Sequence, residues 1–165
     1  MNGSEVLTTI AQLGMAVTGF SGIAIAFKRT PGKLSEFEAF RVVILFANSL
    51  AAVFLSLIPF AFYHAGWNDR SIWRASSGLL FLFELFFLAS QIPAVRRFLR
   101  LHREFFNIKL LTFVVCGHFL NMILQLLNTI GLTKASLSFF IFGLLWILFQ
   151  SVFQFGRILF VQRDS

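Results

Sequence analysis

The chain alternates between long apolar runs and short polar connections. Five apolar runs, at about 6–27, 41–63, 72–95, 109–132 and 137–161, are each long enough to cross the hydrocarbon core of a membrane as a helix. The runs are continuous and do not alternate, so they predict helices and not the strands of a barrel. The pattern therefore predicts an all-α integral membrane protein, a single bundle of five transmembrane helices over residues 1–165.

Composition supports a membrane protein, and the charges predict its orientation. Hydrophobic residues make up 58% of the chain and charged residues only 13%, which is unlike a soluble globular protein. Of the 14 Lys and Arg residues, 11 fall in the first connection, the third connection and the C-terminal segment or near the ends of the runs beside them. The positive-inside rule then predicts an N-terminus outside and a C-terminus in the cytoplasm. A short chain with this bias fits a bacterial inner membrane, and its net charge of +7 follows from topology and does not indicate nucleic acid.

The third connection is basic and amphipathic. Arg96, Arg100 and Arg103 fall at helical spacing, Arg97 lies beside them, and apolar residues cover the opposite side. One interpretation is that the third helix continues through 96–107 along the cytoplasmic face, where these arginines bind anionic lipid headgroups specifically. The sequence favours ordinary anchoring, in which the arginines reach out of the membrane toward the headgroups and water.

The first apolar run carries small residues at four-residue steps. These residues are Gly14, Thr18, Gly22 and Ala26. A smooth face of this kind lets the backbone of another helix approach closely. The pattern predicts a helix-packing face, either against the same bundle or against a second copy of the chain, and the sequence leaves both open.

Polar side chains recur on single faces of the later helices. In "CGHFLNMILQLLN" four of them share one stripe, and the third and fifth runs repeat the pattern at similar steps. Lipid is the least favourable surrounding for such a set. Its members are Glu84, Gln91, His118, Asn121, Gln125, Asn128, Gln150, Gln154 and Arg157, and the second run adds Asn48.

Glu84 is the central member of this polar set. It stands in the middle of "GLLFLFELFFLASQ", where a carboxylate is costly unless a partner or water compensates it. Depth along the predicted spans places His118, Asn121 and Gln150 near it, so we expect these to be its partners. Arg157 lies about two turns nearer the cytoplasm, which disfavours a direct pair with Glu84.

A shared polar interior supports two classes of function. The favoured one is an oligomeric channel-like or proton- or ion-conducting protein, because a buried carboxyl beside an imidazole can pass protons, and amides from several copies can line a channel. The alternative is a structural or accessory subunit, in a homo-oligomer or beside another membrane protein, whose polar stripes only hold helices together. The odd number of spans and the lack of an internal repeat disfavour an inverted-repeat carrier.

Cofactor chemistry finds little support. Cys116 is the only cysteine, so a Cys-based metal site has no second ligand. His64, His102 and His118 fall at different depths, which does not fit a haem held by two imidazoles. We therefore expect neither a metal nor another cofactor.

The letters "GFSG" at 19–22 resemble the nucleophile motif of the rhomboid proteases. The resemblance implies Ser21 as a nucleophile and His118 as its base, in a minor alternative function as an intramembrane enzyme. The motif lies on the first helix, however, and no separate His/Asn set for an oxyanion hole accompanies it. An enzyme is thus the less favoured class.

Overall fold

A computed structural model describes residues 3–27, 36–101 and 108–160. These residues form five α-helices and no strand: α1 (Ser4–Phe27), α2 (Glu36–His64), α3 (Asp69–Leu101), α4 (Ile108–Thr129) and α5 (Ser136–Phe160). All five are long and apolar enough to cross a membrane. The prediction of an all-α bundle with five membrane-spanning helices is confirmed.

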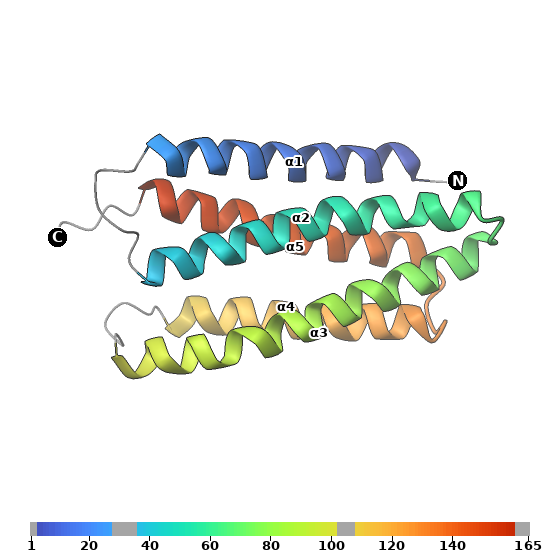
Figure 1. The fold of residues 1–165 in the computed structure, drawn as a ribbon. Coiled ribbons are helices and arrows are strands. Elements are labelled where there is room, and N and C mark those ends of the chain that lie inside the picture. The colour runs from blue at the N-terminus through green and yellow to red at the C-terminus, as the bar shows by residue number, and fades with distance from the viewer. Residues whose placement is uncertain (1–2, 28–35, 102–107, 161–165) are drawn as a thin grey trace.

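Consecutive helices run antiparallel in one bundle (Figure 1). α2 and α5 pack against each other, α1 packs on both of them, and the α3–α4 pair also packs on both. Among the described residues α1 contacts neither α3 nor α4. We call the end where α1 begins the N-terminal end of the bundle and the end where α5 finishes the C-terminal end (Figure 1).

Turn geometry sets where two of the helices stop. Gly66 follows α2 and Gly131 follows α4, with φ of 80° and 81°, a left-handed conformation that strains any other residue. After Gly131 the backbone N–H of Leu132 donates to the carbonyl of Leu127 at 3.0 Å, the bond that closes a Schellman turn. α4 therefore ends at Thr129 and does not continue to 132.

Two helices begin in polar sequence before their apolar runs. α2 begins at Glu36, and its first turn holds Glu36 and Glu38, whose negative charge suits the positive end of the helix dipole. α3 follows Asn68, whose Oδ1 accepts a hydrogen bond from the backbone N–H of Ser71 at 2.9 Å. This bond caps the helix and explains why α3 begins at Asp69 and not at 72.

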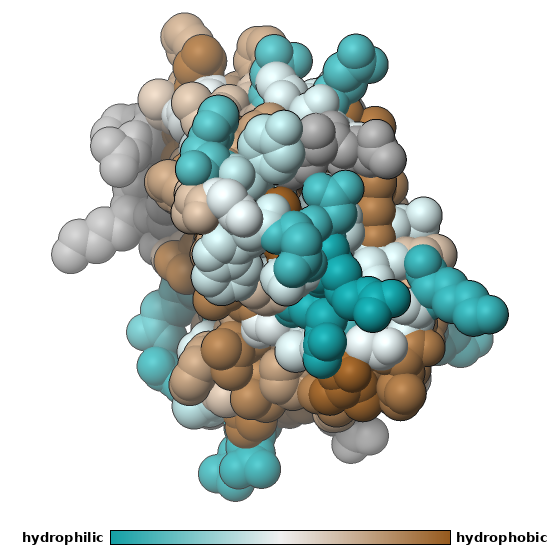
Figure 2. Space-filling view, turned by 90° about the vertical axis from the view of Figure 1, so that its right-hand side faces the viewer, coloured by the Kyte–Doolittle hydropathy of each residue, from teal (hydrophilic) through white to brown (hydrophobic). Residues whose placement is uncertain are grey.

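The apolar core lies mainly in the half of the bundle nearer the N-terminal end. It combines side chains from the start of α1, the second half of α2, the first half of α3 and the first half of α5. Its two aromatic members are Trp73 and Phe140, and its aliphatic members include Leu7, Leu55 and Leu144. Large apolar side chains also cover the outside of the bundle, as expected for contact with lipid. Seen from the N-terminal end, hydrophilic residues gather at the tip of the molecule (Figure 2).

The predicted packing face on α1 divides into two parts. Thr18 Oγ1 donates to Ser49 Oγ of α2 at 2.8 Å, and a Cβ on Gly14 would lie only 2.9 Å from the Ser49 carbonyl oxygen. This part packs closely within the bundle. Gly22 and Ala26 are exposed, and a Cβ on Gly22 would meet no atom within 4 Å.

The predicted basic segment lies at the C-terminal end of the bundle. It is helical to the end of α3, and residues 102–107, which include Arg103, lie outside the described residues. Arg96 and Arg100 are exposed. Arg97 is also exposed and forms an ion pair of 2.8 Å with Glu36 of α2. At least one arginine of this segment therefore has a partner within the protein.

Candidate functional site

Glu84 lies at the middle of α3 and is completely buried. Its Oε2 contacts Nδ1 of His118, and its Oε1 accepts a hydrogen bond from Nδ2 of Asn121 at 2.9 Å. Both partners stand three residues apart on α4 and so share one face of that helix. Two of the three partners expected from the sequence thus contact Glu84, whereas Gln150 lines the cavity described below.

Burial of Glu84 and His118 is compatible with a single shared proton. The pair is neutral overall whether it consists of an acid and an imidazole or of a carboxylate and an imidazolium, so no isolated charge is buried. Aromatic rings hold the imidazole in place: the ring centroid of Phe87 lies 5.9 Å from that of His118, and the centroid of Trp146 lies 5.8 Å away. These contacts hold the pair at a fixed position in the middle of the bundle.

Amide side chains continue from Glu84 toward the N-terminal end. Nε2 of Gln125 donates to Oδ1 of Asn121 at 3.1 Å and to the carbonyl of Phe139 at 2.8 Å. Both amides lie against Gly143 of α5, where a Cβ would be 2.4 Å from Gln125 Nε2 and 2.8 Å from Asn121 Oδ1. The missing side chain of Gly143 leaves room for the two amides and lets Gln125 of α4 donate to the Phe139 carbonyl of α5.

Asn128 extends the polar chain to the surface. One turn beyond Gln125, its Nδ2 donates to Ser77 Oγ at 2.7 Å and to the carbonyl of Ser136 at 2.8 Å. Its Oδ1 accepts a hydrogen bond from Thr133 Oγ1. Thr133 lines an open hollow of about 650 Å³ at the N-terminal end. Polar groups thus lead from this surface to the middle of the bundle.

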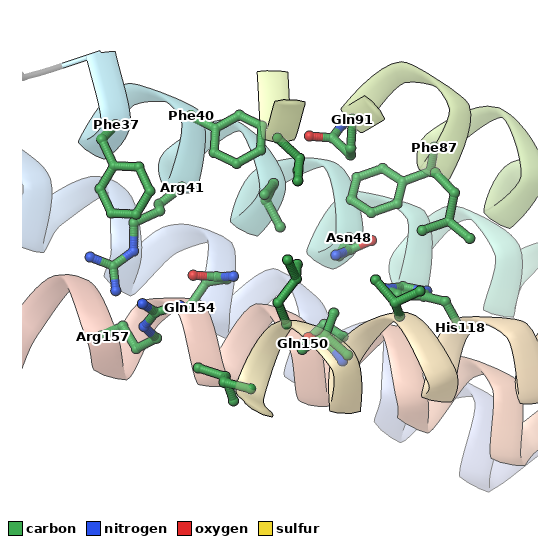
Figure 3. A pocket seen from close by; sticks show the side chains of 17 residues that line it. Phe37, Phe40, Arg41, Asn48, Phe87, Gln91, His118, Gln150, Gln154 and Arg157 are labelled. Carbon is green, nitrogen blue, oxygen red and sulfur yellow. The ribbon is translucent and has the colours of Figure 1, made fainter. Parts of the chain in front are cut away.

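A cavity of about 120 Å³ lies on the other side of His118, toward the C-terminal end (Figure 3). It is enclosed by residues of α2, α3, α4 and α5, and its walls are largely apolar. One water molecule needs about 10–15 Å³ of such volume, so several can fit. The polar lining residues are Arg41, Asn48, Gln91, His118, Gln150, Gln154 and Arg157.

Three buried amides that line the cavity have polar atoms with no hydrogen-bond partner among the residues that the structure describes. They are both side-chain atoms of Asn48, Nε2 of Gln150 and Oε1 of Gln154. These side chains are 0%, 1% and 8% exposed, respectively. An unpartnered buried polar group costs about 1–3 kcal/mol, so each favours a content of the cavity that can form hydrogen bonds.

Two arginines lie at the end of the cavity away from His118. Arg41 is 6% exposed, and its guanidinium lies 5.4 Å from the ring centroid of Phe37. Arg157 is half-buried and lies 5.8 Å from the centroid of Phe153. Figure 3 shows both guanidinium groups on the same side of the view, with His118 on the opposite side. The cavity therefore extends from two arginines to His118.

The polar set predicted from the sequence divides between these two halves. Glu84 and His118 stand between them, and Gln91, which also donates to Ser90 Oγ at 2.9 Å, belongs to the cavity. The N-terminal half contains Asn121, Gln125 and Asn128, and the cavity contains Gln91, Gln150, Gln154 and Arg157.

Sequence analysis did not assign Arg41, Thr133 or Gly143 to the site. Arg41 was counted only among the charges that set the topology, yet it stands seven residues before Asn48, and this spacing places both on one face of α2. The same seven-residue step separates Gly143 from Gln150 on α5. Thr133 lies in a short turn, and no helical spacing marks it.

The structure does not bring Ser21 and His118 together. Ser21 is on α1 and His118 is on α4, and these helices do not contact each other. Nδ1 of His118 faces Glu84 instead. A nucleophile and its base must lie within hydrogen-bond reach, so the geometry gives no support to the enzyme alternative. Among the described residues no group of three or more His, Cys, Asp or Glu side chains could hold a metal ion.

Comparisons with protein families, with curated proteins and with solved structures found no match for this chain. The fold itself defines the class, an all-α integral membrane protein with five membrane-spanning helices. Within this fold, the buried polar groups around Glu84 and the cavity are the features that can support a function.

Proposed function

We propose that this chain is a proton-conducting membrane protein in which the Glu84–His118 pair is the central proton-binding site. One observation supports this most: the amide chain from the N-terminal end and the cavity from the C-terminal end meet at this pair. Ionisable residues inside membrane proteins commonly form proton relays. Here the only carboxyl in the middle of the described helices is paired with an imidazole.

The cavity supplies the access from the C-terminal end. Water held by Asn48, Gln150 and Gln154 can relay protons toward His118, because each of these amides has an atom to offer as a hydrogen-bond partner. With Nδ1 directed at Glu84, Nε2 is the ring nitrogen left to exchange a proton with this water. The proton then passes between His118 and Glu84 across their direct contact.

The second part of the proposed path leads from Glu84 through the amide side chains toward the N-terminal end of the bundle. Amide side chains do not gain or lose protons near neutral pH, so the direct contacts from Asn121 to Gln125 do not relay a proton by themselves. Water has to enter between these amides before a proton can leave toward Thr133. In the conformation described, the cavity reaches His118 from the side of the C-terminal end, and direct hydrogen bonds between amides occupy the N-terminal side of Glu84.

Orientation and assembly are part of the same proposal. The positive-inside bias places the cavity on the cytoplasmic side of a bacterial inner membrane, with Arg96 and Arg100 near anionic headgroups. The stripe on α4 is buried within one copy of the chain, so the path runs inside a single bundle. A homo-oligomer or an accessory partner would use other surfaces, such as the exposed part of α1 around Gly22.

A purely structural role is the second candidate. The hydrogen bonds from Asn121 to Glu84 of α3 and from Gln125 to the Phe139 carbonyl of α5 favour a structural role, since such bonds hold helices together in membranes and contribute about 1 kcal/mol each. The unpartnered amide atoms of the cavity do not favour it, because they form no hydrogen bond to another helix in the described part of the chain.

Proton flux into proteoliposomes tests the proposal. The native chain and Glu84→Gln are compared under an imposed pH gradient, with the membrane potential clamped, and Glu5→Gln, an exposed acid of α1, is the matched control. We expect flux above that of empty liposomes for the native chain and Glu5→Gln, and background flux for Glu84→Gln. Flux that is unchanged in Glu84→Gln would exclude Glu84 as the proton site. A folded native chain without flux, together with an equally stable Glu84→Gln, would favour the structural role.

A further inference from the structure

We infer that the cavity between α2, α3, α4 and α5 binds a small neutral hydroxyl compound with a compact apolar body, of the phenol type. This inference goes beyond the proton path and does not depend on it. It rests on the donors and acceptors of the buried amides, on the partners of the charged lining residues, and on the size and walls of the cavity.

Unpartnered amide atoms form the polar part of this site. Gln150 and Gln154 stand one turn apart on α5, which packs against α2, and Asn48 lies on α2. All three side chains line the cavity and are more than nine-tenths buried (Figure 3). Nδ2 of Asn48 and Nε2 of Gln150 are donors, and Oδ1 of Asn48 and Oε1 of Gln154 are acceptors. None of these four atoms has a hydrogen-bond partner among the described residues, so the cavity offers both donors and acceptors to a ligand.

This balance of donors and acceptors favours a neutral hydroxyl group. A carboxylate only accepts hydrogen bonds and an ammonium group only donates them, so either ion would leave one kind of amide atom unpaired. A hydroxyl group can donate to one of the acceptors and accept from one of the donors. Both bonds satisfy atoms whose burial without a partner is costly.

The charged side chains of the lining are already engaged within the protein. Arg41 and Arg157 both interact with other residues of the chain. The third titratable lining residue, His118, contacts Glu84. Every charged or titratable side chain in the described lining therefore has a partner, and a neutral ligand suits the site better than an ion.

The size and walls of the cavity suit a compact apolar body. Its volume of about 120 Å³ is close to that of an engineered apolar cavity of about 150 Å³ that binds benzene. Its walls include Phe40, Phe87, Leu111 and Val115. A buried water molecule typically forms about three hydrogen bonds, which these walls cannot supply, so an apolar group displaces such water favourably. A single ring therefore fits among the apolar side chains, with its hydroxyl group toward the amides.

Calorimetric titration of the purified full chain in a non-ionic detergent tests the site, with the same detergent without protein as the background. Phenol is the probe, and toluene has the same ring with a methyl group in place of the hydroxyl group. We expect phenol to bind saturably at millimolar concentration. In Asn48→Leu the ratio of phenol affinity to toluene affinity should fall at least about tenfold, because the buried amide forms hydrogen bonds only with phenol. Gln12→Leu, which removes an exposed amide of α1, should retain the native ratio.

Three results would overturn the inference. The first is phenol binding that does not saturate above the detergent background, the second is a native ratio in Asn48→Leu, and the third is an equal fall in Gln12→Leu. Asn48→Leu breaks no side-chain hydrogen bond of the described residues, so we expect it to fold. If it does not, Gln150→Leu replaces it, and an unchanged ratio there would equally overturn the inference. No gradient is present in detergent, so a chain that does not conduct protons can still bind phenol, and the two proposals can fail separately.

Discussion

Replacing Gly143 with alanine should destabilise the bundle at the hydrogen bond between Asn121 and Gln125. A Cβ at this position would lie 2.4 Å from Gln125 Nε2, 2.7 Å from Leu80 Cδ2 and 2.8 Å from Asn121 Oδ1. All three distances are well below the optimal separation of non-bonded heavy atoms, which is about 3.5–4.0 Å. At least one of these side chains therefore has to move.

The size of the effect follows from what this movement disrupts. The three atoms belong to side chains and can shift, but both amides are completely buried and bonded to each other. Overpacking a close-packed site costs about 1–3 kcal/mol, and alanine recovers up to about 1 kcal/mol through its helix propensity. We expect Gly143→Ala to lower the free energy of unfolding by about 1–2 kcal/mol.

Titration of the detergent-solubilised protein with a denaturing detergent, followed by circular dichroism, measures this difference. Gly22→Ala is the matched control, because a Cβ at Gly22 meets no atom within 4 Å. It should unfold like the native chain or slightly later. If Gly143→Ala unfolds at the same point as Gly22→Ala, the close approach of α5 to the amides of α4 is refuted.

Two further predictions concern the N-terminal end. In a double-mutant cycle, Ser77→Ala and Asn128→Ala should show a coupling in unfolding between about 0.6 kcal/mol, the average for such bonds in a membrane protein, and about 1.7 kcal/mol, the maximum. Independent effects would mean that this buried bond contributes nothing. Gly131→Ala should lower the unfolding free energy by about 1–2 kcal/mol because of its left-handed backbone, as measured by the same titration. Gly156→Ala should not lower it, because a Cβ at Gly156 would meet no atom within 4 Å. Equal effects of Gly131→Ala and Gly156→Ala would show that the turn at Gly131 is not strained.

The five helices could be predicted because an apolar run of about 20 residues reflects the surrounding lipid directly. Their ends could not be, since these depend on local polar chemistry that hydropathy does not register. Asn68 caps α3 before the apolar run begins, and the left-handed Gly131 stops α4 before its apolar run is complete.

The centre of the site could also be predicted in part. Because a helix rises by about 1.5 Å per residue, depth alone places Glu84 level with His118 and Asn121. The division of the polar residues into a hydrogen-bonded half and a cavity could not be predicted. The spacing of residues indicates which face of a helix is buried, but it does not indicate which helix packs against that face. Gln150, at a similar depth, lines the cavity and is not hydrogen-bonded to Glu84 in the described part of the chain.

The division of the α1 face into a packed part and an exposed part could not be predicted for the same reason, because spacing does not show which helix lies opposite. Gly14 and Gly22 look alike in the sequence, but only Gly14 lies against α2. Arg41 was interpreted only as one of the charges that indicate the topology, but its side chain lies inside the bundle.

Infrared difference spectroscopy measures directly whether Glu84 exchanges protons with the solution. Spectra of the native chain in acidic and alkaline buffer are compared with those of Glu84→Gln and of the control Glu5→Gln. We expect a pH-dependent carboxyl band in the native chain that is retained in Glu5→Gln and absent from Glu84→Gln. A native spectrum that does not differ from that of Glu84→Gln would show that the buried carboxyl does not titrate, and would contradict a proton path through it.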